Sequence, residues 1–529
     1  MRHLPPDAQI GGAGTTGALV TSYDIVIVGA GPTGALVAER MAARGMSVVA
    51  LEAGQRFGRN NALPNSEANA GKILWSEPRN HVGNDFVIPK TGMGVGGGTL
   101  PWLGVMPRFH RDDFRTHSTE GVGADWPIGY DDLRPHYEKV EREFGLAGEC
   151  GPFAPEPYSL PMPPHRMNWH GQVLARGARK LGAHPFAPPI AINSQERDGR
   201  SACIYCGWCA SGCPTEAKAT AANTHLAKAE RLGARVISDA FVHRVNYDAA
   251  SGRATGVEYL DSQRREHRVD AKAVVLTAHA IETPRLLLMS SSDTFPDGLG
   301  NSSGMVGRNF MSHPTWQVFG RFDEPVNAFK GMQMGHVMVQ DFYKPRAAND
   351  YARGFILLSY MMTPVTFGNL SGLMFGQELK DFLHEFSHTA AWWAHAEGLP
   401  DVRNTITLDP DLRDARGLPV AQVSYKWCDN DVKLAAAARD KAAEMMAASG
   451  ARKVRIGLNY GAHAMGTCRM GRDAKTSVVN EFCQSHDIKN LFICDTSVFV
   501  TGSGVNPTLT AMAVASRASE YIVAKAREF

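Results

Sequence analysis

The stretch from residue 23 to residue 54, YDIVIVGAGPTGALVAERMAARGMSVVALEAG, constrains the fold of this chain more than any other segment. Its apolar and helix-forming runs predict a strand, a helix and a second strand, at residues 25–28, 35–44 and 47–51. Between the first strand and the helix, Gly29, Gly31 and Gly34 form a G-x-G-x-x-G motif. The motif in this context predicts a nucleotide-binding βαβ unit.

Each glycine of the motif has a separate structural task. Gly29 permits the tight turn, Gly31 lets a pyrophosphate approach the helix N-terminus, and Gly34 lets helix and strand pack closely. Glu52 ends the second strand, where an acid hydrogen-bonds a ribose hydroxyl. Because Glu52 is followed by Ala-Gly, as in the E-x-G ending of flavoproteins, FAD is favoured over NAD.

Composition excludes several classes of protein. The chain has 529 residues, 44% of them hydrophobic, with a net charge of +2 and a mean hydropathy of -0.22. The near-zero net charge does not indicate a basic surface that would bind nucleic acid. No apolar run approaches the ~20 residues needed to span a membrane. Residues 1–22 lack a basic start followed by an apolar region, so we expect a disordered extension and no signal peptide.

Four of the nine cysteines lie within eleven residues. They are Cys203, Cys206, Cys209 and Cys213. Their spacing, C-x2-C-x2-C-x3-C-P, is that of bacterial ferredoxins and predicts an iron-sulfur cluster, either 3Fe-4S or 4Fe-4S. A structural zinc site, a redox-inert loop and ligation of only three irons by three of the four cysteines remain alternatives. The five scattered cysteines are expected to be small core residues.

The remaining pattern predicts a discontinuous FAD-binding domain with a second domain inserted in it. Residues 23–313 and 455–529 contain further parallel strands and glycine turns, together with the cysteine-rich loop 201–220. A helix at residues 133–144 is expected to be capped by Asp131 or Asp132. Residues 314–454 are rich in aromatic residues and methionine, and we expect them to form the substrate-binding domain.

Six separated motifs resemble those of the glucose-methanol-choline (GMC) oxidoreductase family, in particular the catalytic subunits of bacterial gluconate, fructose, sorbitol and FAD-dependent glucose dehydrogenases. They are G-x-G-x-x-G at 29–34, V-G-G-G-T at 95–99, D-W-P-I-x-Y-D-D-L at 125–133, I-E-T-P-R-L-L-L-M at 281–289, H-x-M-G-T-C-R-M-G at 463–471 and G-V-N-P-T-L-T at 504–510. The resemblance covers residue 23 to the end of the chain and implies the α/β GMC fold, with a Rossmann-like FAD-binding domain.

The resemblance also implies which residues contact FAD. At two positions this chain departs from the family pattern. The implied contacts are Gly29, Gly31, Gly34, Glu52, Gly97, Gly98, Thr99, Val242, Asp495, Asn506, Pro507 and Thr508. Where relatives carry a histidine that can link covalently to the flavin, this chain has Pro101, so FAD is expected to be noncovalent. Where the family usually has glycine before I-E-T-P, this chain places the bulky His279 near the nucleotide.

For catalysis the resemblance implies His463 and Asn506. A neutral imidazole can take the proton of an alcohol at physiological pH, whereas the Asn506 amide can only orient the alcohol by hydrogen bonding. Glu397 matches a family acid near this pair and is assigned a supporting role. We expect His313 to be structural and His486 to be exposed.

The sequence therefore predicts an FAD-dependent dehydrogenase of a sugar, glycoside or polyol. Electrons are expected to pass through the iron-sulfur cluster to a cytochrome c or quinone-linked acceptor, with a possible small subunit that carries an export signal. The chain is then expected in the cytoplasm, or in the periplasm if it is co-exported. Two alternatives are an oxidase that reduces O2 to H2O2, and a non-redox lyase or binding protein that retains FAD.

Overall fold

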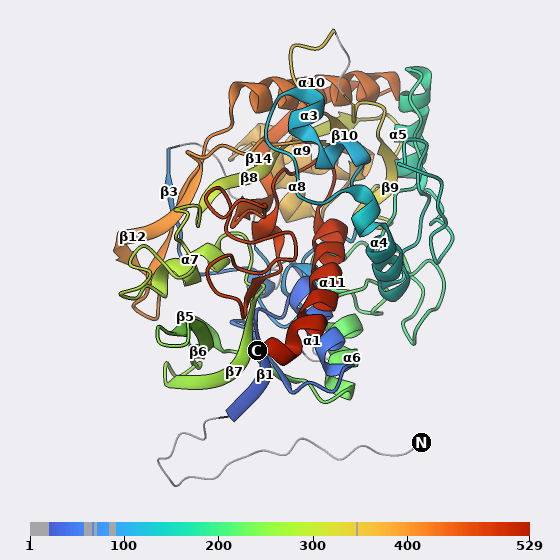
Figure 1. Cartoon of the computed structure of the whole chain (residues 1–529). Helices are drawn as coiled ribbons and strands as arrows, with labels where there is room; N and C mark the ends of the chain where they lie inside the picture. Colours follow the sequence, from blue (N-terminus) through green and yellow to red (C-terminus); the bar gives the residue numbers. More distant parts are fainter. Residues whose placement is uncertain (1–20, 58–65, 68–70, 84–90, 345–347) are drawn as a thin grey trace, which may run out of the picture.

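Two β-sheets organise the molecule (Figure 1). The structure is a computed structural model and describes residues 21–57, 66–67, 71–83, 91–344 and 348–529. Of the predicted extension at residues 1–22, only the last two residues lie in these ranges. Thr21 and Ser22 already belong to strand β1, where they pair with Val269 and Asp270.

The first sheet has the predicted βαβ unit at its centre. Its strand order is β4-β2-β1-β7-β6-β5, and β15 also pairs with β7. The strands are β1 Thr21–Val28, β2 Val48–Leu51, β4 Arg235–Ile237, β5 Phe241–Asp248, β6 Arg253–Leu260, β7 Glu266–Leu276 and β15 Leu491–Ile493. The strands β1, β2, β4 and β15 run parallel to their partners, and β2 is buried along its whole length. Burial on both faces explains why these strands are continuous apolar runs.

Helices pack behind this sheet. The helix α1, Pro32–Ala42, returns the chain from β1 to β2, which confirms the predicted βαβ unit. It packs against α11, Thr508–Lys525, and α11 packs against α4, Tyr130–Phe144. The prediction for α4 was wrong at its start. Asp132 accepts a hydrogen bond from the Gly129 N–H at 2.8 Å, so the acid lies inside the first turn and the helix begins three residues earlier than predicted.

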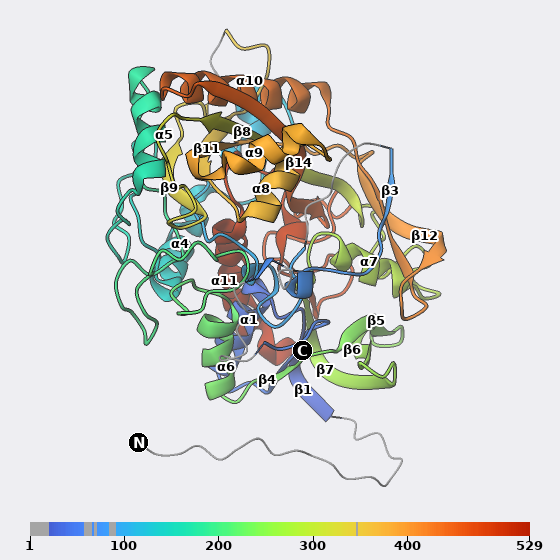
Figure 2. The ribbon, with the colours of Figure 1, turned by 180° about the vertical axis from the view of Figure 1, so that it is seen from behind.

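The second sheet has the order β3-β13-β12-β8-β11-β10-β9, and β14 also pairs with β8. The strands are β3 Asn80–Val82, β8 Arg308–Arg321, β9 Met334–Val339, β10 Phe355–Tyr360, β11 Thr389–Ala396, β12 Thr405–Arg413, β13 Pro419–Ser424 and β14 Lys453–Thr467. Two helices, α10 at Asp429–Ala448 and α5 at Trp169–Lys180, pack on this sheet (Figure 2).

The remaining helices are short. They are α3 Thr116–Glu120, α6 Ala227–Arg231, α7 Glu282–Met289, α8 Pro364–Leu370 and α9 Gln377–His384. Across the described ranges, each helix is too short or too polar to cross a lipid bilayer.

Long strands join the two parts of the chain that were predicted as separate domains. The proposed substrate-binding domain, residues 314–454, begins inside β8 and ends at the second residue of β14. Both strands continue beyond these limits into residues assigned to the FAD-binding domain. The strand β14 carries His463 near its end, so the catalytic candidate is fixed to the second sheet.

Candidate functional site

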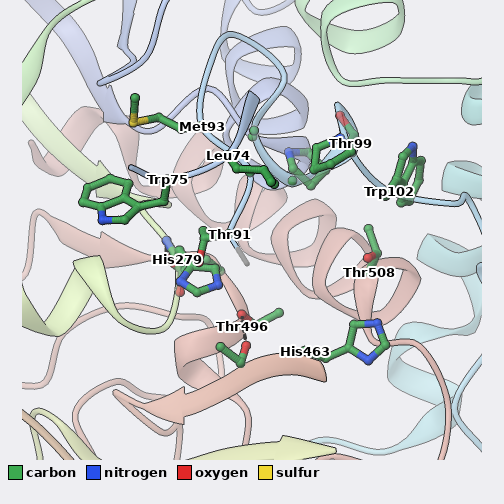
Figure 3. Close-up of a pocket in the computed structure, with 18 of the residues that line it drawn as sticks. Leu74, Trp75, Thr91, Met93, Thr99, Trp102, His279, His463, Thr496 and Thr508 are labelled. Atoms are coloured by element: carbon green, nitrogen blue, oxygen red, sulfur yellow. Dashed lines mark hydrogen bonds between the residues drawn. The ribbon is translucent and has the colours of Figure 1, made fainter. Parts of the chain in front are cut away.

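A cavity of about 790 Å³ is lined by residues of both sheets (Figure 3). The side chains of Trp75 and His279 lie toward one part of the cavity, and those of His463 and Thr508 lie toward another. The cavity therefore extends from the glycine turn of the first sheet to the catalytic candidates on the second.

The glycine turn fits the three tasks predicted for it. Gly29 has a φ of +99°, which is the left-handed region that glycine adopts without strain. A Cβ on Gly34 would lie 2.1 Å from the carbonyl oxygen of Gly29, so this position permits the close contact of helix and strand. Gly29 and Gly31 line the cavity, whereas Gly34 lies behind the turn. Gly31 precedes α1, whose N-terminus has no side-chain cap, and free N–H groups there suit a pyrophosphate.

A second glycine loop lies directly against the first. A Cβ on Gly97 would lie 2.7 Å from the Cα of Gly31. Glu52 connects the two loops, because its carboxylate accepts hydrogen bonds from the N–H groups of Ala30 at 3.0 Å and Gly94 at 3.1 Å. Burial raises the pKa of Glu52, although these backbone donors oppose the shift. Glu52, the residue predicted to hydrogen-bond the ribose, therefore lies at the cavity wall.

The other residues predicted to contact FAD also line the cavity. They are Gly98, Thr99, Val242, Asp495, Asn506, Pro507 and Thr508. Pro507 and Thr508 form the start of α11, whose N-terminus likewise has no side-chain cap and faces the cavity. Two uncapped helix N-termini supply hydrogen-bond donors, the Glu52 carboxylate supplies an acceptor, and the glycines leave room for close approach. Together these groups fit the pyrophosphate, ribose and ring system of FAD.

His279, the departure from the usual family glycine, points into the same cavity (Figure 3). Its φ of +88° is a conformation in which glycine is favoured, which accounts for the usual residue. The strained backbone is held by Asp495, which accepts a hydrogen bond from the His279 N–H at 3.0 Å. Burial lowers the pKa of His279 to about 3, so the imidazole is neutral beside the nucleotide side of the cavity.

His463 and Asn506 come together as the sequence motifs imply. The Nε2 of His463 lies 3.3 Å from the Nδ2 of Asn506, and both residues line the cavity. The pairing of β14 with β8 shifts register between Ala462 and Met465, and His463 has a φ of +60°. Such an irregularity turns a side chain out of the regular alternation of a strand. It directs His463 into the cavity.

Sequence reasoning missed the surroundings of His463. Its Nδ1 lies 3.0 Å from Nδ1 of His313 and 3.2 Å from Nε2 of His395. We call these three residues the histidine cluster. His313 was expected to be merely structural, and His395 was not singled out. His395 comes two residues after Trp393 in β11, so the two side chains share a face of the strand, but only the tertiary structure places Trp393 at the cavity.

Burial and the neighbouring His313 lower the pKa of His463 well below 6.5. Burial also lowers the pKa of His395, and that of His313 to about 4. All three rings are therefore neutral at physiological pH. A neutral imidazole at the cavity wall can accept a proton.

Glu397 does not line the cavity and is directed elsewhere. Its Oε2 accepts a hydrogen bond from Arg353 at 2.9 Å, and the same guanidinium forms ion pairs with Asp113 and Glu120. We call these four residues the charge cluster. Burial, with help from Asp113, raises the pKa of Glu397, although Arg353 opposes the shift. The acid thus stabilises a buried network, and its predicted supporting role near the catalytic pair stays a prediction.

The four clustered cysteines line one small cavity beside the main one. Cys206 is exposed and Cys209 is buried. Burial raises the pKa of Cys203 to about 12 and that of Cys209 to about 11. The loop contacts the wall of the main cavity through Lys218, whose ammonium donates to the carbonyl oxygens of Cys209 and, at 3.0 Å, of Trp102.

Comparison with known proteins identifies the family. Two family models described as GMC oxidoreductase match residues 14–315 and 400–515. The chain is 34% identical to the 2-methyl-1,2-propanediol dehydrogenase of Mycolicibacterium austroafricanum, over 84% of this chain and 83% of that protein. It is 31% identical to the fructose dehydrogenase large subunit of Gluconobacter japonicus, over 95% and 98% of the two chains.

Solved structures share the fold of this chain. The crystal structure of pyridoxine 4-oxidase from Mesorbium loti is similar with a TM-score of 0.66 at 18% identity, over 95% of this chain and 99% of that one. The family match, the shared fold and a cavity with the donor set for FAD agree with one another. The chain belongs to the GMC oxidoreductase family and is an FAD-dependent oxidoreductase.

Proposed function

We propose that the protein oxidises a CH–OH group of a sugar, glycoside or polyol and passes the electrons on as a dehydrogenase. The observation that carries this proposal is the His463–Asn506 pair, which lies at the wall of the same cavity as the dinucleotide glycines. Bound FAD supplies the acceptor for a hydride. The chain itself must bind the alcohol, orient it and remove its proton.

His463 is the base in this proposal. Its neutral Nε2 faces Asn506 at 3.3 Å and can accept the hydroxyl proton of an alcohol that lies beside both residues. The Asn506 amide can donate to the alcohol oxygen but cannot take its proton. The N-terminus of α11 follows immediately, at Thr508, and its partial positive charge favours negative charge that develops nearby.

The walls around His463 support a polyhydroxylated substrate. Trp393, Tyr360 and Tyr460 line this part of the cavity with Met334 and Met362. Aromatic faces provide apolar walls, and the phenol groups provide a few fixed polar contacts, a combination typical of small-molecule sites. Both the propanediol and the fructose dehydrogenase relatives are named for polyhydroxylated substrates.

The cysteine loop supports an iron-sulfur cluster held by Cys203, Cys206, Cys209 and Cys213. The four cysteines line one small cavity together, and their C-x2-C-x2-C-x3-C-P spacing is that of the cluster ligands of bacterial ferredoxins. The N–H groups of Tyr205 and Lys218 donate to Cys203 and Cys213, each at 3.4 Å. Such a cluster would supply one-electron transfer near the surface.

The proposed electron acceptor is a cytochrome c or a quinone-linked protein, and a small subunit is a further proposed partner. Cys206 is exposed, and Ile204 beside it is 61% exposed, which suits an exit for electrons. The Gluconobacter relative is itself named as a large subunit.

The test is an anaerobic screen of sugars, glycosides and polyols for bleaching of the flavin absorbance. Bleaching followed by reduction of an artificial acceptor, with little H2O2 in air, is the expected result. Peroxide formation at the full turnover rate would select the oxidase. Failure of every alcohol to bleach the flavin would favour a non-redox role.

The cluster is tested separately with Cys206→Ser and a matched Cys428→Ser control outside the loop. We expect the Cys206 variant to lower iron and acid-labile sulfide and to slow cytochrome c reduction, while substrate still bleaches FAD at the normal rate. The control should change none of these. Wild-type protein purified anaerobically without iron, sulfide or an electron paramagnetic resonance signal would contradict the cluster.

FAD is proposed to be noncovalent because Pro101 lines the cavity where a linking histidine stands in some relatives. Acid precipitation should therefore release all the FAD into the supernatant. Flavin absorbance that stays with the polypeptide would show a covalent link through another residue.

A further inference from the structure

The histidine cluster contains two imidazoles that the proposed chemistry does not use. His313 lies on β8 and His395 on β11, and both are fully buried. Their ring nitrogens lie 3.0 and 3.2 Å from Nδ1 of His463, on the side of the ring opposite to Asn506. Neither residue lines the cavity, so neither touches a substrate directly.

Backbone carbonyls fix the tautomers of these two rings. The Nε2 of His313 lies 2.8 Å from the carbonyl oxygen of Ser503, and the Nδ1 of His395 lies 3.0 Å from that of Gly504. A carbonyl oxygen can only accept, so each of these nitrogens carries the proton. Because burial keeps both rings neutral, the other nitrogen of each ring carries no proton and can accept a hydrogen bond through its lone pair. These are the two nitrogens that face His463.

Two acceptors on one side of His463 determine its own tautomer. The Nδ1 of His463 must be the donor, shared between His313 and His395, because two lone pairs cannot hydrogen-bond each other. The proton of the neutral ring then sits on Nδ1, and the lone pair sits on Nε2. That lone pair accepts from the Asn506 amide at 3.3 Å and faces the cavity.

We propose that His313 and His395 are positioning residues that together hold His463 in the Nδ1–H tautomer, with the Nε2 lone pair directed at the substrate. This inference rests on the proposed role of His463 as the base. The two residues act through His463, and they take the place that a carboxylate occupies in a serine-protease triad, where it fixes the tautomer of the catalytic histidine.

Two neutral acceptors differ from a carboxylate in one respect. The carboxylate also stabilises the imidazolium by its charge, whereas His313 and His395 are uncharged. Glu397, which follows His395 by two residues, accepts a hydrogen bond from Arg353. The cluster thus sets the orientation and the tautomer of the base without raising its pKa, which matches the lowered pKa of His463.

One loop supports the whole arrangement. Residues 502–506 supply the carbonyls of Ser503 and Gly504 and the side chain of Asn506. Strand pairing supplies the rest, because β8 pairs with both β11 and β14, and Ala462 is the partner of His313. The tautomer of the base is therefore determined by the contact of this loop with the centre of the second sheet.

Pairs of variants with nearly equal shape test the proposal. His313→Leu and His395→Met remove the acceptor nitrogens, whereas His313→Asn and His395→Gln place an oxygen acceptor near the same positions. In FAD-loaded enzyme with ¹⁵N-labelled histidine, we expect the His463 signals of the wild type and of the Asn and Gln variants to show a protonated Nδ1 and an unprotonated Nε2. The double variant with Leu and Met should shift toward protonated Nε2. The signals of His463 are assigned by their loss in His463→Gln.

Rates provide the second readout. With an alcohol that bleaches the flavin, the Leu and Met double variant should slow single-turnover flavin reduction about 10- to 1000-fold, below the ~10⁴-fold loss that follows removal of a tautomer-fixing carboxylate. The Asn and Gln variants should recover most of the rate.

The spectroscopic result needs no substrate, so the inference can fail while the proposed function stands, and the reverse. A protonated Nε2 on His463 in the wild type would overturn the inference, as would an unchanged tautomer in the double variant. If the double variant does not fold, the wild-type tautomer and the two single variants decide the question.

Discussion

The nucleotide side of the cavity and the histidine cluster are built in different ways. The glycine turn, α1 and Glu52 come from a single stretch of 32 residues, within which Glu52 accepts a hydrogen bond from Ala30, 22 residues away. The second glycine loop and the start of α11 complete the cavity wall from more distant parts of the chain. The histidine cluster joins three strands, with 150 residues between His313 and His463. The centre of the cofactor site is thus a local motif, whereas the base is held by long-range strand pairing.

Gly34→Ala should have the largest effect, since it attacks the local motif directly. The new Cβ would lie 2.1 Å from the Gly29 carbonyl oxygen and 2.6 Å from Oγ1 of Thr277. Overpacking of this kind costs ~1–3 kcal/mol or more, and here it displaces the turn that holds FAD. We expect loss of FAD and of all flavin-dependent activity, measured as the ratio of flavin to protein absorbance.

Gly71→Ala is the matched control for this change, because among the described residues no atom beyond the chain neighbours lies within 4 Å of a Cβ there. It should keep normal FAD content. A Gly34 variant that binds FAD as well as the wild type would show that the close contact of helix and strand is dispensable.

His463→Ala tests the long-range side of the comparison. The variant should fold and retain FAD, because His463 is not part of the nucleotide cradle, but flavin reduction should fall by ~10² to 10⁴ as for loss of a general base. Asn506→Ala should cost less, since the amide only orients the alcohol. Both rates are measured by stopped-flow bleaching. Nearly normal reduction in the histidine variant would mean that another residue is the base.

Acid should destabilise the protein through its buried histidines. His313 on β8 and His170 on α5 are buried, and burial lowers the pKa of each to about 4. The unfolded chain has the higher pKa of 6.5 and binds more protons between these values, so stability is complete above pH 6.5 and falls as pH drops toward 4. Each residue should cost roughly 3 kcal/mol across this range. Thermal unfolding from pH 7 to pH 4.5 measures the loss.

The matched test replaces His170 with Gln, which removes the titrating group at a position that does not line the cavity. This variant should lose less stability on acidification than the wild type does. An unfolding temperature with the same pH dependence in both proteins would show that His170 is not responsible.

Glu397→Gln should have the smallest effect. The carboxyl lies in the charge cluster and not at the cavity, so flavin reduction is expected to stay within tenfold, a change of less than about 1.4 kcal/mol. Arg353 keeps an oxygen acceptor in this variant. If the rate of flavin reduction falls as much as in Asn506→Ala while thermal stability is unchanged, Glu397 takes part in the reaction.

The fold class and the nucleotide side could be predicted from the sequence because their signals are local. A strand, a glycine turn and a helix follow one another within 32 residues, and the glycines allow few other conformations there. The family motifs also identified His463 and Asn506 as candidate catalytic residues. The errors on this side were small, such as the start of α4 at Tyr130 instead of residue 133.

Tertiary structure alone decided what surrounds His463 and where Glu397 points. His395 faces His463 because β11 and β14 both pair with β8 in a particular register, and a shift of one residue would turn each side chain to the opposite face. Glu397 comes two residues later, where Arg353 draws its carboxylate into the charge cluster. The sequence determined which groups could do chemistry, whereas strand register, which depends on contacts between residues 68 to 159 positions apart, decided which of them meet.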